Sequence, residues 1–265
     1  MTTLSIGQFT ALDVSVEDYL GLAAANGCQA ASVLVVPPGG NTALPLVTVN
    51  NLAGVQAKLQ ETGLSILNVE CLMLTPKTVV AEFRPALELG AALNAKGVTA
   101  LIYDTDDERV RHNITELCAM ASEYGLRVNL EFLALSPKWN NLQEVTALVE
   151  SLAQPNLGLG VDLLHLIRAG NTPQDLAAVP KALIHYVQIC DSADGSANSN
   201  YGEEAGSHRL APGAGVFPVV EFLQSLPKGT PIEMEVPQPF TEPAAARLKK
   251  IAEASKAQIA LAGLV

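Results

Sequence analysis

The chain has 265 residues, close to the usual size of one (β/α)8 barrel, although two small domains would also fit that length. Its formal net charge of −11 argues against nucleic acid or an anionic membrane as a partner, because both select clusters of Lys and Arg. The opening MTTLSIGQF lacks the basic and apolar regions of a secretory signal, and no apolar run is long enough to cross a bilayer, so a cytoplasmic location is expected.

The cysteines are scattered along the chain without a CxxC pair. This spacing predicts buried free thiols, rather than a zinc knuckle or a disulfide framework, for Cys28, Cys71, Cys118 and Cys190. The oligomeric state is left open, with a homo-oligomer as one alternative.

The first half of the chain repeats one pattern, in which a helical segment ends in glycine and an apolar strand follows at once. The glycines suit the left-handed position after a helix and are Gly27, Gly63, Gly97 and Gly125. We expect strands at 4–9, 31–36, 64–72 and 98–103, and helices at 16–26, 48–62, 78–95 and 107–124.

The second half continues the alternation. We expect strands at 126–134, 157–165, 184–191 and 232–236, and helices at 142–152, from about 173, at 218–225 and from about 243. A stretch rich in Gly, Ser and Asn interrupts the pattern at 192–215 and is expected to be a loop. Its first part, 192–206, is either a lid that closes over substrate or a slack loop.

Eight strands that alternate with eight helices predict βαβ units and a parallel sheet. No linker-like change of composition divides the chain, so we expect one α/β domain over 1–265, a (β/α)8 TIM barrel. A doubly wound open sheet is the alternative, but it usually carries a glycine-rich phosphate loop after its first strand, and GQFTALD is not one.

Four successive strands carry a polar residue late in an otherwise apolar run. These residues are Glu131, Asp162, Gln188 and Glu235. The active sites of such barrels lie at the carboxyl ends of the strands, so the four side chains are expected to meet there. They supply only oxygen ligands, which predicts a site for Mn²⁺ or Mg²⁺. Co²⁺ and Zn²⁺ are the alternatives, although Zn²⁺ is less natural without a His or Cys ligand.

Each residue also has a simpler interpretation. Glu131 could pair with a Lys or Arg inside the barrel, and Asp162 could cap the turn into the next helix. Gln188 could satisfy backbone groups at the end of its strand. Glu233 shares a strand face with Glu235, which we select because it lies nearer the carboxyl end.

Three further residues are candidates for substrate contacts. His165 follows Asp162 by three residues and could move a proton or donate a hydrogen bond, unless it is a structural histidine. Arg209 precedes the glycine-rich LAPGAG and could hold a substrate oxygen or phosphate, unless it is a solvated charge. Glu70, on the third expected strand, is an additional acid that faces the same region.

The segments VNLEF, GVDLLHLIRAG, YVQICDS, RLAPGAG and IEMEVP occur in this order. In order and spacing they resemble the sugar phosphate isomerase/epimerase superfamily, the xylose isomerase-like barrels related to endonuclease IV (AP endonuclease family 2 type). The resemblance implies a metal held by Glu131, Asp162, Gln188 and Glu235. It also implies that two glutamates move a proton on the sugar, and that His165 and Arg209 contact it.

One position departs from the common pattern of the family. Many members have His where this chain has Gln188, whereas the dehydroshikimate dehydratases of the family are similar to it in having Gln. The chain also lacks the many Cys and His ligands of the endonuclease IV branch, which argues against DNA repair.

The expected function is therefore a divalent-metal-dependent isomerase or epimerase of a keto-sugar, sugar phosphate or cyclitol, acting through an enediolate. Glu131 or Glu235 would be the base, and the other would return the proton. A metal-dependent dehydratase of a cyclic hydroxy-ketone, of the 3-dehydroshikimate type, is one alternative. A barrel without catalytic activity that serves as a binding subunit is the other.

Overall fold

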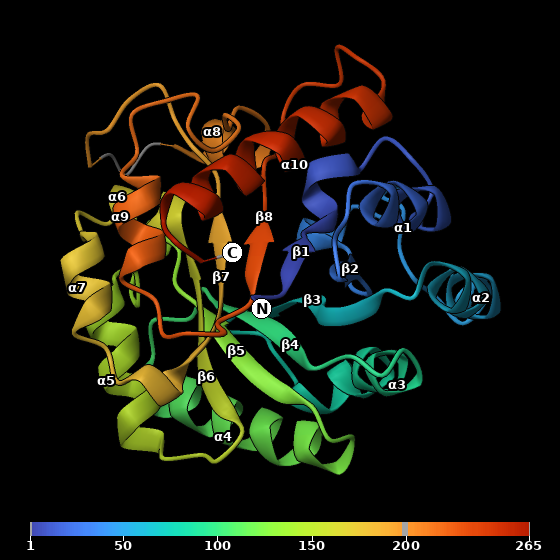
Figure 1. The fold of residues 1–265 in the computed structure, drawn as a ribbon. Coiled ribbons are helices and arrows are strands. Elements are labelled where there is room, and N and C mark those ends of the chain that lie inside the picture. The colour runs from blue at the N-terminus through green and yellow to red at the C-terminus, as the bar shows by residue number, and fades with distance from the viewer. Residues whose placement is uncertain (1, 198–200, 265) are drawn as a thin grey trace.

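Eight parallel strands form a barrel surrounded by helices in the computed structural model, which describes residues 2–197 and 201–264 (Figure 1). The strands are β1 (Leu4–Ile6), β2 (Ala30–Leu34), β3 (Ser65–Leu74), β4 (Gly97–Ile102), β5 (Arg127–Glu131), β6 (Leu157–Asp162), β7 (Ile184–Ile189) and β8 (Ile232–Met234). They pair in the order β1-β8-β7-β6-β5-β4-β3-β2, and a parallel bridge between Gly7 and Ser32 joins the two ends of this series. The expected (β/α)8 barrel is confirmed.

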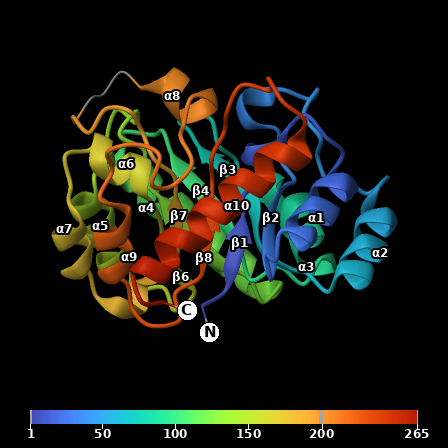
Figure 2. The same ribbon diagram turned by 45° about the horizontal axis from the view of Figure 1, so that its top comes forward.

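The helices lie on the outside of the strands (Figure 1). They are α1 (Val16–Ala25), α2 (Leu52–Thr62), α3 (Arg84–Ala92), α4 (Asp107–Glu123), α5 (Leu142–Leu152), α6 (Leu163–Arg168), α7 (Pro173–Ala177), α8 (Gly202–Ser207), α9 (Val219–Gln224) and α10 (Ala244–Leu261). Short 3-10 turns are η1 (Gln8–Ala11), η2 (Pro38–Gly40), η3 (Val80–Phe83) and η4 (Lys181–Leu183). In the tilted view α8 lies at the end of the barrel away from both chain termini (Figure 2). No helix of the described chain is long and apolar enough to span a membrane.

Side-chain caps fix where several helices begin. The side chains of Ser15, Asp106 and Asn141 accept hydrogen bonds from the backbone N–H three residues ahead, which satisfies a donor that has no partner inside the helix. At the other end, Gly27, Gly63 and Gly125 have the expected positive φ angles. The prediction for Gly97 is wrong: this residue begins β4, and Asn94 takes the left-handed conformation (φ 53°) instead.

Two predicted helices are too long. The helix expected over 48–62 begins only at Leu52, because Asn51 Oδ1 accepts a hydrogen bond from the Thr48 backbone N–H (2.7 Å) and holds these residues in a turn. The helix expected over 78–95 is divided into η3 and α3, with Pro85 in the first turn of α3, where its missing N–H costs nothing.

Two helices were not expected. The strand predicted over 157–165 ends at Asp162, and α6 begins directly after it, so His165 lies on a helix. The loop predicted over 192–215 contains α8. The part of the lid prediction that falls on 198–200 lies outside the described residues. All four cysteines are buried and free, as predicted.

Tyr186 fills the barrel interior beneath the carboxyl ends of the strands. Its ring lies against the backbone of Gly160, where a Cβ atom would come within 2.5 Å of the ring. Its hydroxyl hydrogen-bonds with the Thr99 hydroxyl across the barrel (3.0 Å). Gly160 therefore leaves the space in which this large side chain can lie.

We predict that Gly160→Ala lowers the free energy of unfolding by about 1–3 kcal/mol, because the rigid, buried Tyr186 ring cannot move aside. Gly21→Ala is the matched control: its Cβ would meet nothing within 4 Å and would favour α1 by about 0.5–1 kcal/mol. Urea unfolding of both variants measures the difference. Equal stability of the two variants would contradict the packing described for Tyr186.

Candidate active site

A cavity of about 220 Å³ lies at the carboxyl ends of the strands. Its charged and titratable lining consists of Glu70, Glu131, Glu235, His165 and Arg209, together with Cys71 and Tyr103. Thr99, several apolar side chains, and the glycines and alanine of α8 complete the wall. Ligand pockets for drug-sized molecules are usually larger, about 300–1,000 Å³, so this cavity suits a small molecule.

Asp162, the last residue of β6, serves both the fold and the site. Its Oδ1 accepts a hydrogen bond from the Leu164 backbone N–H (2.8 Å) and caps α6, as the simpler interpretation expected. Its Oδ2 accepts from Arg209 Nη1 (2.5 Å) at the cavity. The same carboxylate therefore fixes the start of α6 and part of the site.

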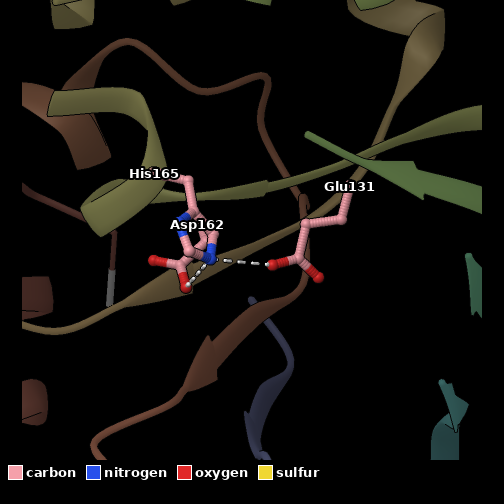
Figure 3. Close-up of side chains that lie close together, drawn as sticks. All are labelled: Glu131, Asp162 and His165. Carbon is pink, nitrogen blue, oxygen red and sulfur yellow. Dashed lines mark ion pairs between the residues drawn. The ribbon is translucent and has the colours of Figure 1, made fainter. Parts of the chain in front are cut away.

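Helix α6 brings His165 against the two carboxylates at the ends of β5 and β6 (Figure 3). Its Nε2 lies 3.5 Å from Glu131 Oε1 and 3.8 Å from Asp162 Oδ2. Its Nδ1 lies 3.1 Å from the Tyr201 hydroxyl. One donor atom from each of Glu131, Asp162 and His165 lies within 4.8 Å of the others, a spacing at which the three could hold a metal ion.

Arg209 joins two of the predicted metal ligands. Its Nη1 donates to Asp162 Oδ2, and its Nη2 lies 3.2 Å from Glu235 Oε2. Its Nε donates to the backbone carbonyl of Ala205 (3.0 Å), so the guanidinium also holds α8. The side chain is buried, and the interpretation of a solvated charge is wrong.

Gln188 connects Glu233, which lies on β8, with Glu235, which directly follows that strand. Its Nε2 donates to Glu233 Oε1 (3.2 Å) and Glu235 Oε1 (3.0 Å), and its buried Oε1 has no hydrogen-bond partner. Glu233 Oε2 accepts from the hydroxyls of Ser5 (2.7 Å) and Ser32 (2.5 Å), so the protein itself satisfies this carboxylate. Glu235, in contrast, lines the cavity.

Crowding of carboxylates sets the electrostatics of the site. Burial, with the nearby Glu235 and Asp162, raises the pKa of Glu131 well above its usual range. Burial, with Asp162 and Glu233, raises the pKa of Glu235 to about 8 although Arg209 opposes the shift. Burial lowers the pKa of His165 to about 4. The site thus carries more carboxylates than its one arginine can balance.

These features fit a divalent cation. A cation would relieve the repulsion between the carboxylates, and oxygen donors suit Mg²⁺ and Mn²⁺. The unpartnered Oε1 of Gln188 is a further donor, and rotation of the amide about the last side-chain bond exchanges its oxygen and nitrogen. His165 offers a nitrogen ligand beside Glu131 and Asp162, which zinc would favour.

Two positioning residues were not identified in the sequence. Asp191 Oδ1 accepts from the backbone N–H groups of Ser192 (2.8 Å) and Phe217 (2.9 Å), and its Oδ2 accepts from those of Gly213 and Gly215 (both 2.9 Å). It therefore folds the loop that carries Arg209. The available signal was the Asp of YVQICDS, which directly precedes the predicted polar loop.

Arg168 is the second such residue and lies one turn after His165 on α6. Its guanidinium pairs with both oxygens of Glu204 on α8 (2.8 and 2.7 Å) and donates to the Ser192 hydroxyl (2.8 Å). Helix α8 is thereby fixed over the cavity. In the segment HLIR this arginine follows His165 by three residues, which indicated that the two lie close together. Nothing in the sequence indicated its partner Glu204, which lies 36 residues further along the chain.

Residues 20–258 match the family model described as xylose isomerase-like TIM barrel, and the chain belongs to this family. An inosose isomerase of Halalkalibacterium halodurans is 27% identical over 160 residues, 57% of this chain and 55% of that protein. A 3-dehydroshikimate dehydratase of Pseudomonas aeruginosa is 30% identical over 132 residues, 50% of this chain and 19% of that protein. The chain thus matches about half the length of the first relative and a smaller part of the second.

Among solved structures, an IolI protein with a bound zinc atom has a TM-score of 0.80 and 17% identity. The alignment covers 99% of this chain and 98% of that one. At this level of identity the likeness concerns the fold.

We predict that Asp191→Asn lowers the free energy of unfolding by about 1–3 kcal/mol, because an amide leaves some of the four backbone N–H groups without an acceptor. Asp194→Asn is the matched control, since Asp194 lies exposed in the same loop. Thermal unfolding compares the two variants. A melting temperature of Asp191→Asn equal to that of Asp194→Asn would show that Asp191 does not hold this loop.

Proposed function

We propose that the protein is a divalent-metal-dependent isomerase or epimerase of a keto-sugar or cyclitol. The observation that carries this proposal is the pair Glu131, at the end of β5, and Glu235, directly after β8. Both residues line one small cavity, and β6 and β7 lie between their strands in the barrel. Two carboxylates on different sides of a substrate can remove a proton and return one. The inosose isomerases among the relatives and the sugar-sized cavity support the same class of substrate.

The proposed metal ligands are Glu131, Asp162, Glu235 and Gln188 through its Oε1. Arg209 and the amide of Gln188 now bond to some of the same carboxylates, so binding of the ion requires both side chains to adjust. Mn²⁺ or Mg²⁺ suits the oxygen donors, and Co²⁺ or Zn²⁺ gains support if His165 joins them. The bound ion would act as a Lewis acid on the substrate carbonyl and its adjacent hydroxyl.

The proton transfers are assigned to the two glutamates. One of them, Glu131 or Glu235, takes the proton from the carbon beside the carbonyl, and the electrons of the C–H bond form the enediolate. The other returns a proton to the opposite face for epimerisation or to the neighbouring carbon for isomerisation. His165 orients Glu131 from 3.5 Å, and Tyr201 holds the far side of its ring. Helix α8 covers the reacting groups and limits the access of water.

A dehydratase is the second candidate. Its support is the 3-dehydroshikimate dehydratase among the relatives and the Gln at position 188. The same enolate would then lose a β-hydroxyl group instead of regaining a proton. An elimination product that absorbs in the ultraviolet separates this candidate from the isomerase. A barrel without activity remains the third interpretation, and failure to bind any divalent ion would favour it.

The metal proposal predicts about one divalent ion per purified chain, with most of the ion lost in Glu131→Gln and Asp162→Asn, because each variant removes a charged donor. The control is Asp104→Asn, which removes another buried carboxylate paired with an arginine, Arg109, outside the cavity. Elemental analysis measures the metal in all four proteins. Wild-type protein that binds no ion even after incubation with Mn²⁺ would refute the proposal.

We predict that His165→Ala lowers turnover about 10²-fold or more but keeps the metal, because His165 is proposed to act on Glu131 and the substrate. Metal content and turnover of an inosose or a ketose are measured on the same preparation. His112→Ala serves as the control, since His112 is exposed on α4. Loss of the ion in His165→Ala would instead make His165 a metal ligand.

A further inference from the structure

The cavity holds no free positive charge among the residues that the structure describes. Arg209 is the only Lys or Arg in the described lining, and all three of its guanidinium nitrogens have partners: Ala205, Asp162 and Glu235. His165 faces two carboxylates with one nitrogen and the Tyr201 hydroxyl with the other. Residues 198–200 lie outside the described chain, and their sequence, Asn-Ser-Asn, carries no charge.

The arginine beside the cavity is engaged as well. Arg168 pairs with both oxygens of Glu204 and donates to the backbone carbonyl of Ser196 (2.6 Å). A phosphate or carboxylate of the substrate would therefore have to displace one of these ion pairs. In proteins such anions are normally recognised by an available arginine or lysine, or by backbone N–H groups at a helix start.

Glu70 on β3 adds an unusual acid to the same cavity. Its side chain is 2% exposed, and its Oε2 has no hydrogen-bond partner. Its Oε1 lies 3.5 Å from the Thr99 hydroxyl, so this bond is weak. Buried polar groups are nearly always hydrogen-bonded in folded proteins, and one that lines a cavity without a partner is placed to bond a ligand.

We propose that the substrate is a neutral polyol without phosphate or carboxylate, and that Glu70 determines specificity by hydrogen-bonding one of its hydroxyl groups. The proposal deepens the isomerase function and rests on it. A hydroxyl can both donate to and accept from a carboxyl group, whereas an anion would face Glu70, Glu131 and Glu235 in a buried space. Burial and the nearby Glu233 raise the pKa of Glu70, which supports a carboxyl group that can also donate.

A bound divalent ion does not change this conclusion. Together with Arg209 it would balance the charges of Glu131, Asp162 and Glu235, and no positive charge would be left for an anionic substrate. Substrate recognition would then depend on hydrogen bonds, for which the cavity offers Glu70, Thr99 and Tyr103.

Calorimetric titration of the Mn²⁺-incubated full chain tests the charge of the substrate. The probes are matched pairs, D-fructose with D-fructose 6-phosphate and myo-inositol with myo-inositol 1-phosphate, together with 3-dehydroshikimate. We expect a neutral probe to bind at least about tenfold more tightly than its phosphate and than 3-dehydroshikimate. A phosphate that binds as tightly as its neutral partner, or preferred binding of 3-dehydroshikimate, would overturn the inference.

The outcomes separate this inference from the proposed function. Tight binding and isomerisation of a sugar phosphate would refute the neutral substrate but keep the isomerase. Preferred binding and dehydration of 3-dehydroshikimate would refute both and support the dehydratase. If none of the probes binds, neither the polyol isomerase nor the neutral substrate stands.

Variants at position 70 test the hydrogen bond to the tightest neutral probe. Glu70→Gln keeps a donor and an acceptor and should bind within about threefold of wild type, whereas Glu70→Leu should bind about tenfold or more weakly. Asn68→Leu is the matched control, since Asn68 lies on β3 but bonds to Asn129 outside the cavity. Unchanged binding by Glu70→Leu would overturn the role of Glu70.

A second measurement needs no substitution at position 70. Analogues of the same probe that each lack one hydroxyl are titrated into the wild-type chain. The analogue that lacks the hydroxyl bound to Glu70 should bind about tenfold more weakly than the intact probe, because Glu70 is then left without a partner. If no single hydroxyl matters, the assigned hydrogen bond does not exist.

Discussion

The ion pair of Arg209 with Asp162 and Glu235 is the interaction on which the carboxyl end of this barrel depends. Parallel strands that end at one rim bring their last side chains together, and here those side chains are mostly carboxylates. Without a cation their repulsion and desolvation would oppose the closure of the barrel. An arginine suits this position better than a lysine, because its planar guanidinium stays charged and can bond two carboxylates at once.

The loop and helix around the cavity serve that arginine. Asp191 gathers four backbone N–H groups and folds the loop in which Arg209 lies. Arg209 in turn donates from Nε to the backbone carbonyl of Ala205 on α8, and Arg168 on α6 pairs with Glu204 of the same helix. Helix α6 starts on the cap supplied by Asp162, the carboxylate that Arg209 binds. A substitution at any of these residues should therefore alter the arrangement of the side chains around the cavity.

The sequence predicted the barrel and the rim residues because both depend on local patterns. An acid such as Glu131 in an apolar strand is visible without any structure, and alternation of strands and helices fixes the class of fold. The sequence could not predict which partner each polar group finds, since Arg209 meets Asp162 across 47 residues. It also missed α8, because the Gly- and Ser-rich composition around it is typical of loops and the anchor, Arg168, lies on another element.

Charge balance would couple folding to the binding of the proposed cation. The folded chain brings Glu131, Asp162 and Glu235 together, with Arg209 paired to the last two, whereas in the unfolded chain these carboxylates are separated and hydrated. A divalent ion that binds only the gathered carboxylates must stabilise the folded state, by an amount that grows with its concentration relative to its dissociation constant. Arg209 already pairs with Asp162 and Glu235, so the arginine and a bound ion would compete for the oxygen atoms of these carboxylates. Both cations would nevertheless offset the negative charge of the site. The one arginine therefore offsets part of the charge of the three acids, and the proposed cation would offset the rest.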